Sequence, residues 1–279
     1  MMKLTSYLAS QNAVRGFLDN PDMREKEGVM FAYAADAATL QRLVPAPLRV
    51  AAPVVAGYVT HMGNPSFARP YDEAVLYTMV AYQDKMVGAY PFGLFLAGPG
   101  AEMALVAGRE GASIPKKLAD QIQIKHDDTG VRAQVIRHGT TLIDVCVTPG
   151  MPNDPEQAQQ LFGPQLRLNH PVETVNFFVD YQLAQQEDGT NRFTNTRLLA
   201  TQTTNITTAF TPGKLALTLT SSADDPVGEL AVQHLIGGGT YTMASAKMHQ
   251  TTVLTQLDAA KVAPYLITGR YDQSILSNN

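Results

Sequence analysis

Short runs rich in Val, Ile, Thr, Tyr and Phe, separated by turn residues, dominate this 279-residue chain. Such runs have high β propensity and predict short strands. The turns Asp127–Gly130 and Glu187–Gly189 are of the hairpin type. The predicted strands are Val29–Ala34, Val54–His61, Val75–Tyr82, Phe92–Ala97, Glu102–Gly108, Val131–His138, Thr141–Val147, Glu173–Tyr181, Phe193–Phe210, Leu215–Thr220 and Thr242–Met248.

Helix signals are few. Asp36 can cap a helix over Ala37–Val44 that Pro45 ends, and Asp154 with Pro155 begins one over Glu156–Leu161. Asp225 with Pro226 repeats that signal and predicts a short helix within Pro226–Ile236. The segment Thr252–Leu266 is a candidate terminal helix.

No linker, repeat or low-complexity tract divides the chain, and strands do not alternate with helices as in a doubly wound sheet. We therefore expect one mainly β domain of the α+β class, built as two stacked sheets or a closed barrel. Residues 1–25 form an N-terminal extension in this interpretation, and residues 250–279 form a C-terminal helix or tail.

Composition narrows the function classes. The net charge is −4 with no basic run, which argues against nucleic acid and anionic membrane surfaces as partners. The N-terminus lacks the continuous apolar core of a signal peptide, and no stretch approaches the roughly 18 apolar residues of a membrane span. We expect a cytoplasmic protein, and its single cysteine, Cys146, excludes an internal disulfide.

The adjacent pair Lys116–Lys117 is the strongest chemical feature. Two neighbouring ammonium groups repel each other, and burial in an apolar pocket disfavours the charged form further, so one amine can be neutral and nucleophilic. A neutral lysine amine attacks ketones to form a Schiff base. Side chains of neighbouring residues on a strand point to opposite faces, so burial can contribute more than the proximity of the two lysines.

The context of this pair resembles the acetoacetate decarboxylase family. Gly108-Arg109-Glu110 precedes Pro115-Lys116-Lys117-Leu118-Ala119 with the spacing of the family signature. Weaker similarities lie at Leu40–Leu48, Tyr71–Glu73, Thr196–Leu219 and Val232–Met243. The resemblance implies a large antiparallel β-barrel or cone with a few short peripheral helices, with the lysine pair inside it. It also implies a homo-oligomer.

The resemblance assigns roles to three residues. Lys116 matches the Schiff-base lysine, Lys117 its activating neighbour, and Glu73 an active-site glutamate that suits general acid–base chemistry. Lysine activation by a second cation is the mechanism attributed to acetoacetate decarboxylase. Arg109 and Glu110 are interpreted as a polar pair that fixes the loop before the lysines.

Two positions depart from the family pattern. Lys26 takes the place of an arginine that engages the substrate carboxylate, with Arg24 two residues earlier, and Tyr58 takes the place of a second glutamate. Lysine lacks the bidentate fork of arginine, so we expect weak acetoacetate decarboxylation. Tyr241 is a candidate proton donor that can reach the pocket, although core packing also explains it.

The leading hypothesis is therefore a Schiff-base lyase that decarboxylates a small β-keto acid, the partner we expect for this protein. A pyruvate aldolase-dehydratase using the same lysine is one alternative, and a non-catalytic barrel that binds a small molecule is another. The six histidines show no metal-ligand spacing, and no phosphate or dinucleotide motif occurs. We expect no metal or organic cofactor.

Overall fold

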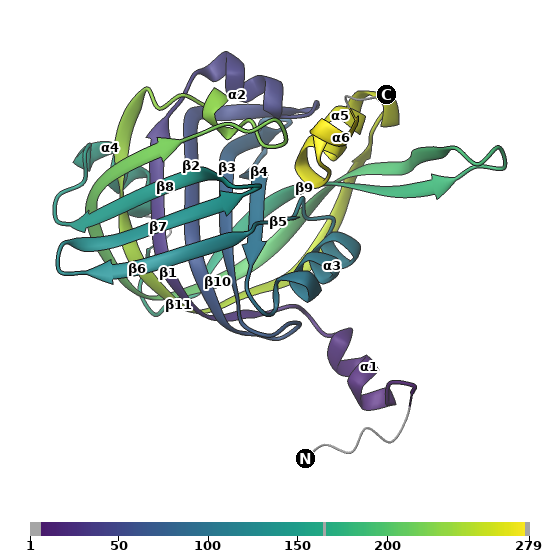
Figure 1. Ribbon diagram of the computed structural model, residues 1–279, viewed down its shortest axis with the longest axis horizontal. Coiled ribbons are helices and arrows are strands. Elements are labelled where there is room, and N and C mark those ends of the chain that lie inside the picture. Colours follow the sequence, from purple (N-terminus) through teal and green to yellow (C-terminus); the bar gives the residue numbers. More distant parts are fainter. Residues whose placement is uncertain (1–6, 164–165, 277–279) are drawn as a thin grey trace.

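The structure is a computed structural model, and it describes residues 7–163 and 166–276. Eleven strands form one sheet, in which the order β11-β1-β2-β3-β4-β9-β10 closes into a ring because β10 also pairs with β11 (Figure 1). Neighbours in this ring are antiparallel, except that β4 meets β9 in parallel at Ala89 and Asn176. The ring strands are β1 (Met23–Ala34), β2 (Leu48–Pro65), β3 (Tyr71–Tyr82), β4 (Met86–Ala97), β9 (Val172–Gln185), β10 (Asn191–Leu219) and β11 (His234–Gln256).

The rest of the sheet continues from the far half of β10. That half pairs with β8 (Thr140–Pro149), which leads to β7 (Gly130–Arg137) and β6 (Gln121–Asp127). Figure 1 shows these three strands crossing in front of β1–β4. The short β5 (Lys117–Leu118) pairs in parallel with β4.

Successive side chains of the ring strands point to opposite faces of the sheet, so one face packs in the core and the other faces a cavity. On β1, Val29, Phe31 and Tyr33 are fully buried and pack in one cluster with residues of β6–β8. Lys26 and Met30, on the opposite face of the same strand, line a cavity. The main apolar core therefore fills the space between the ring and its β6–β8 extension, while the other face remains free to build a site.

Short helices lie at the periphery, as predicted (Figure 1). The N-terminal α1 stands apart from the sheet, and α5 packs over Val80 and Phe177 of the ring through Val262 and Leu266. None of the helices described is both long and apolar enough to cross a membrane. The helices are α1 (Gln11–Phe17), α2 (Ala37–Leu43), α3 (Ala101–Ala112), α4 (Pro155–Phe162), α5 (Ala259–Arg270) and α6 (Gln273–Leu276).

The predicted fold class is confirmed, as are the helices capped by Asp36 and Asp154. Each aspartate side chain accepts a hydrogen bond from a backbone N–H in the first turn. The turns at Asp127–Gly130 and Glu187–Gly189 also join paired strands. The second of these ends a hairpin that projects from the body of the protein (Figure 1).

One predicted strand, Glu102–Gly108, is wrong, because this segment belongs to α3. Its residues are mostly good helix formers, and the buried ones are Ala101, Ala104 and Gly108. That spacing places them on one helical face and does not fit the two-residue period of a strand.

Two predicted helices are wrong in extent. Within Pro226–Ile236 only the 3₁₀ turn Val227–Glu229 is helical, because β11 begins at His234 and pairs there with β1. In the segment Thr252–Leu266, β11 continues to Gln256 through pairing with β10, and α5 starts only after its cap, Asp258. The predicted boundary at residue 250 therefore falls inside the last strand.

Candidate active site

A cavity of about 650 Å³ lies inside the ring, because all seven ring strands contribute to its lining. We call it the ring cavity. Its volume falls within the roughly 300–1,000 Å³ range of small-molecule sites. Five methionines line it, and their flexible thioether side chains adapt to an aliphatic ligand. They are Met23, Met30, Met79, Met243 and Met248.

Lys116 enters this cavity from the loop that follows α3. Only 2% of the residue is exposed, and Nζ donates a hydrogen bond to the carbonyl oxygen of Ala104 at 3.2 Å. The same nitrogen lies 3.5 Å from Oε2 of Glu73 and over the rings of Tyr71 and Phe67, at 5.8 and 5.9 Å. Its amine is therefore dry and faces both a proton acceptor and the ring cavity.

Arg109 holds the backbone of this loop. Its Nε and Nη2 donate to the carbonyl oxygen of Lys116 at 2.8 and 2.6 Å, and Nη2 also donates to the carbonyl oxygen of Arg270. The predicted structural role of Arg109 agrees with these contacts. The loop is thereby fixed between the end of α3 and the end of α5.

Glu73 lies on the cavity face of β3 and is 3% exposed. The hydroxyl of Tyr58 donates to Oε1 at 2.8 Å, and that of Tyr71 donates to Oε2 at 3.4 Å. Burial, followed by the charge of Glu73, raises the pKa of both phenols well above the usual tyrosine value. Both tyrosines therefore stay protonated and donate to the carboxylate.

Lys26 supplies the second ammonium beside Lys116. It is 6% exposed, and its Nζ lies 4.8 Å from the centre of the Tyr58 ring. Burial lowers its pKa below the usual lysine value, an effect that Glu73 opposes and Lys116 reinforces. Two lysines and one glutamate thus share one dry pocket, in which burial disfavours the charged form of Lys26.

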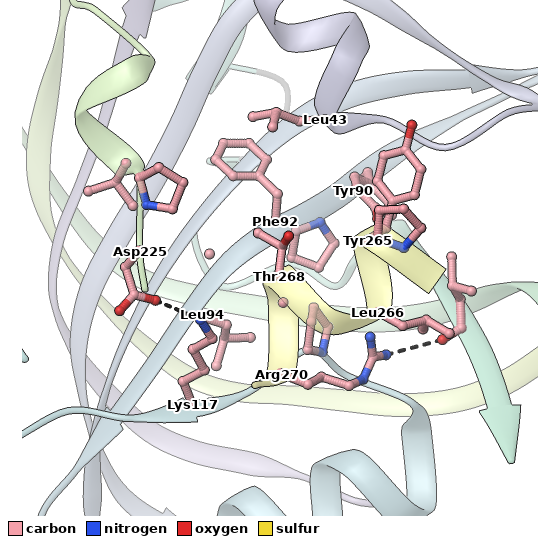
Figure 2. Close-up of a pocket in the computed structure, with 18 of the residues that line it drawn as sticks. Leu43, Tyr90, Phe92, Leu94, Lys117, Asp225, Tyr265, Leu266, Thr268 and Arg270 are labelled. Carbon is pink, nitrogen blue, oxygen red and sulfur yellow. Dashed lines mark hydrogen bonds and ion pairs between the residues drawn. The ribbon is translucent and has the colours of Figure 1, made fainter. Parts of the chain in front are cut away.

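Lys117 points elsewhere, contrary to its predicted action on Lys116. Its Nζ donates to Oδ1 of Asp225 at 2.8 Å (Figure 2). It also donates to the carbonyl oxygen of Asp224 at 2.9 Å. It lines a different cavity from Lys116 because adjacent side chains of an extended segment point to opposite sides. Asp225 compensates its charge, and the lysine that lines the ring cavity together with Lys116 is Lys26.

Of the other predicted site residues, Tyr241 lines the ring cavity and Arg24 lies outside it. Tyr241 is buried and lines the ring cavity, where burial raises its pKa. Arg24 is exposed and bonds to Asn64, outside the cavity, so its predicted contact with substrate does not fit the structure. Arg24 and Lys26 lie on the same face of an ideal strand, but Glu25 between them has a positive φ of 54° that distorts β1.

Sequence reasoning missed two contributors to the site. Tyr71 shares the face of Glu73 on β3, a signal that two-residue alternation contains. Gly108 of α3 lies directly against Lys116, and a Cβ placed there would be 2.7 Å from Cε and 3.0 Å from Nζ. Nothing in the local pattern reveals that contact, because it depends on how α3 folds back over the loop.

Gly108→Ala should therefore displace the Lys116 side chain and lower turnover by about 10²-fold, as expected for a misplacement near 1 Å. The nearest atoms belong to a flexible side chain, so the fold should survive. Gly111→Ala is the matched control, because its Cβ meets nothing within 4 Å. It should keep full activity and gain about 0.5–1 kcal/mol of stability from helix propensity. Equal activity of the two variants, measured with their denaturation curves, would contradict this packing argument.

One cluster of potential metal ligands occurs among the described residues. Ligand atoms of His138, Asp224 and Asp272 lie within 4.8 Å of one another. Arg137 already binds Asp272, and the backbone N–H of Ser274 binds Asp224 at 2.7 Å. These partners account for the acidic groups as a network of ion pairs and hydrogen bonds.

Comparison with known proteins identifies the family. Residues 7–257 match the family described as Acetoacetate decarboxylase (ADC). The chain belongs to the acetoacetate decarboxylase family. A curated relative in this comparison, "CLA biosynthesis isomerase" of Lactiplantibacillus plantarum, is 47% identical over 274 residues, which cover 98% of this chain and 97% of the relative.

Solved structures show the same fold. Acetoacetate decarboxylase from Legionella pneumophila has a TM-score of 0.69 at 18% identity, covering 85% of this chain and 88% of that one. The enduracididine biosynthesis enzyme MppR, complexed with the condensation product of pyruvate and imidazole 4-carboxaldehyde, has a TM-score of 0.65 at 15% identity, covering 91% and 97%. The family member described here therefore shares its architecture with a decarboxylase and with an enzyme crystallised with a condensation product.

Proposed function

We propose that this protein is an isomerase that moves a carbon–carbon double bond in an unsaturated aliphatic ketone, with Lys116 as Schiff-base nucleophile and Glu73 as proton carrier. The contact between these two groups carries the proposal: Nζ of Lys116 lies 3.5 Å from a carboxylate that opens onto a methionine-lined cavity. The relative that is 47% identical is called an isomerase, which favours this reaction over loss of CO₂.

The reaction needs no net oxidation or reduction. Glu73 accepts a proton from Lys116, and the neutral amine adds to the ketone to form a carbinolamine. Glu73 returns that proton to the hydroxyl of the carbinolamine, which leaves as water and gives the protonated imine. As a carboxylate again, Glu73 removes a proton from the carbon between the imine and the double bond. The electron pair delocalises toward nitrogen as a dienamine. Return of that proton at the far carbon gives the conjugated imine, and water releases product and Lys116.

The tyrosines support this chemistry. Tyr58 and Tyr71 donate to Glu73 and hold its oxygens toward the cavity, while their own protons are retained. A positioned carboxylate transfers protons effectively at a carbon next to a carbonyl group. Enzymes that do this chemistry also use tyrosine hydroxyls as hydrogen-bond donors in the same site. The aliphatic lining accommodates the chain on either side of the double bond.

Two assays test the proposal. A β,γ-unsaturated aliphatic ketone should gain the ultraviolet absorbance of a conjugated enone and take up deuterium from D₂O. Borohydride added during turnover should leave a covalent increment, and peptide mapping should place it on Lys116. Failure of both isomerisation and trapping across several ketones would instead favour a non-catalytic binding protein.

A β-keto acid decarboxylase is the second candidate. The family match and the position of Lys26 favour it, because a buried cation in the ring cavity can bind a carboxylate. Acetoacetate turnover at about 10 per second, a typical enzyme rate, would establish it in place of the isomerase. The aldolase-dehydratase alternative uses the same Lys116, and condensation of pyruvate with an aldehyde would identify it.

Lys26→Met should change the pH profile of imine formation, because it removes from the ring cavity a buried titrating group whose pKa burial lowers. Lys117→Met is the matched control. It should leave that pH profile in place, since Asp225 compensates the charge of Lys117. The rate of borohydride trapping against pH measures both, and a shift in Lys117→Met alone would restore the activating role predicted for Lys117.

A further inference from the structure

A second cavity, of about 460 Å³, lies on the other side of the lysine pair. Figure 2 shows Lys117 and Arg270 along one side of it and Leu43, Phe92 and Tyr90 along the other. We call it the Arg270 cavity. Neither Lys116 nor Glu73 lines it, so nothing in the proposed reaction uses this space.

Arg270 is the unusual group in this cavity. It is 5% exposed, and the hydrogen bonds of its guanidinium come from Nη2, to the carbonyl oxygens of Ser113 and Val179 at 2.6 and 3.1 Å. Its Nε is buried without a hydrogen-bond partner, and no ion pair is formed by Arg270 among the described residues. A buried cation without an anion is costly, and burial accordingly lowers its pKa.

The charges around the cavity favour an anion. Four cationic and two acidic side chains line it: Arg42, Lys117, Lys261 and Arg270 against Asp225 and Glu229. Asp225 binds Lys117 at 2.8 Å and Arg137 at 2.5 Å, so neither Asp225 nor Lys117 offers a free charge to a ligand. The cations that remain are Arg42, Lys261 and Arg270, against Glu229. Arg42 and Lys261 are exposed at the rim, where they attract anions from solvent.

The remaining lining favours an aliphatic body. The apolar side chains of its lining include Leu43, Phe92, Val227 and Leu230, and the volume suits a small molecule. We propose that the Arg270 cavity is a second binding site, distinct from the ring cavity, for a medium-chain aliphatic monocarboxylate. Its carboxylate pairs with Arg270, and its chain covers the apolar wall.

This site adjoins the candidate active site. Pro91, Leu94 and Phe178 line both cavities and form the partition between them. A carboxylate bound at Arg270 therefore contacts the wall of the ring cavity without entering it. The inference does not depend on the proposed reaction, because the two sites share this wall but no reacting group.

Calorimetric titration with decanoate tests the proposal on the full chain, with decanol as the uncharged probe. Decanoate should bind at least about tenfold more tightly than decanol, the effect of one charge-assisted hydrogen-bonded contact. Thr268→Phe, in α5, should abolish binding by filling the Arg270 cavity, and Met79→Trp, which narrows the ring cavity alone, should leave it intact.

Arg270→Gln should weaken decanoate binding at least about tenfold and leave decanol unchanged. If the Arg270→Gln variant does not fold, decanoate binding by Thr268→Phe tests the site instead, because Thr268 is only half-buried and its substitution should be tolerated. Loss of decanoate binding in Met79→Trp with retention in Thr268→Phe would place the ligand in the ring cavity and overturn the inference. Equal affinity for decanoate and decanol, or no binding of decanoate, would overturn it as well.

Discussion

Lys116→Met should abolish borohydride trapping and reduce turnover by at least about 10⁴-fold, the scale found when a covalent nucleophile is removed. The amine is buried, lies 3.5 Å from Glu73 and opens onto the ring cavity, so no water or surface lysine can take its place. Methionine keeps the length and apolar body of the side chain. The Lys116→Met variant should therefore keep the fold, and circular dichroism checks this.

Lys117→Met is the control for this result. It makes the same lysine-to-methionine change at the adjacent residue. That residue lines the Arg270 cavity, where the change removes the ion pair with Asp225. We expect lower thermal stability with trapping retained. An adduct that persists in Lys116→Met and maps to Lys26 would contradict the assignment and transfer the nucleophilic role to that neighbour.

Glu73→Gln should lower turnover by about 10²–10⁴-fold, because general acid–base catalysis contributes that much. Glutamine keeps the shape of the side chain but carries no titratable proton. Exchange of substrate hydrogens with D₂O should fall by the same factor. The protonated imine should still be trapped after long incubation, since the nucleophile itself remains.

Asp72→Asn is the matched control for Glu73→Gln. Asp72 is the preceding residue on β3, and its carboxylate faces away from the cavity and binds Nδ1 of His61 at 2.8 Å. Its substitution should leave deuterium exchange unchanged. Full exchange activity in Glu73→Gln would show that another group carries the proton, and Tyr241 of the ring cavity is the next candidate.

Much of this site follows from local sequence. The spacing of Gly108, Pro115 and Lys116 identifies the family, and alternation along β3 is enough to put Tyr71 and Glu73 on one face. The capped helices at Asp36 and Asp154 and the two hairpin turns are confirmed because each depends on hydrogen bonds within a few residues. Local interactions of this kind can be predicted from the sequence without knowledge of the fold.

Tertiary structure decided where the lysine side chains lie. The sequence places two ammonium groups side by side, yet their side chains enter separate cavities and meet different acids, Glu73 for Lys116 and Asp225 for Lys117. Lys26, ninety positions before Lys116 in the chain, takes the place beside it because β1 and the loop after α3 face the same ring cavity. Sequence neighbours are separated by the direction of their side chains, and only ring closure brings distant residues together. For that reason the position of Glu73 on its strand was predictable, while the lysine that shares the ring cavity with Lys116 was not.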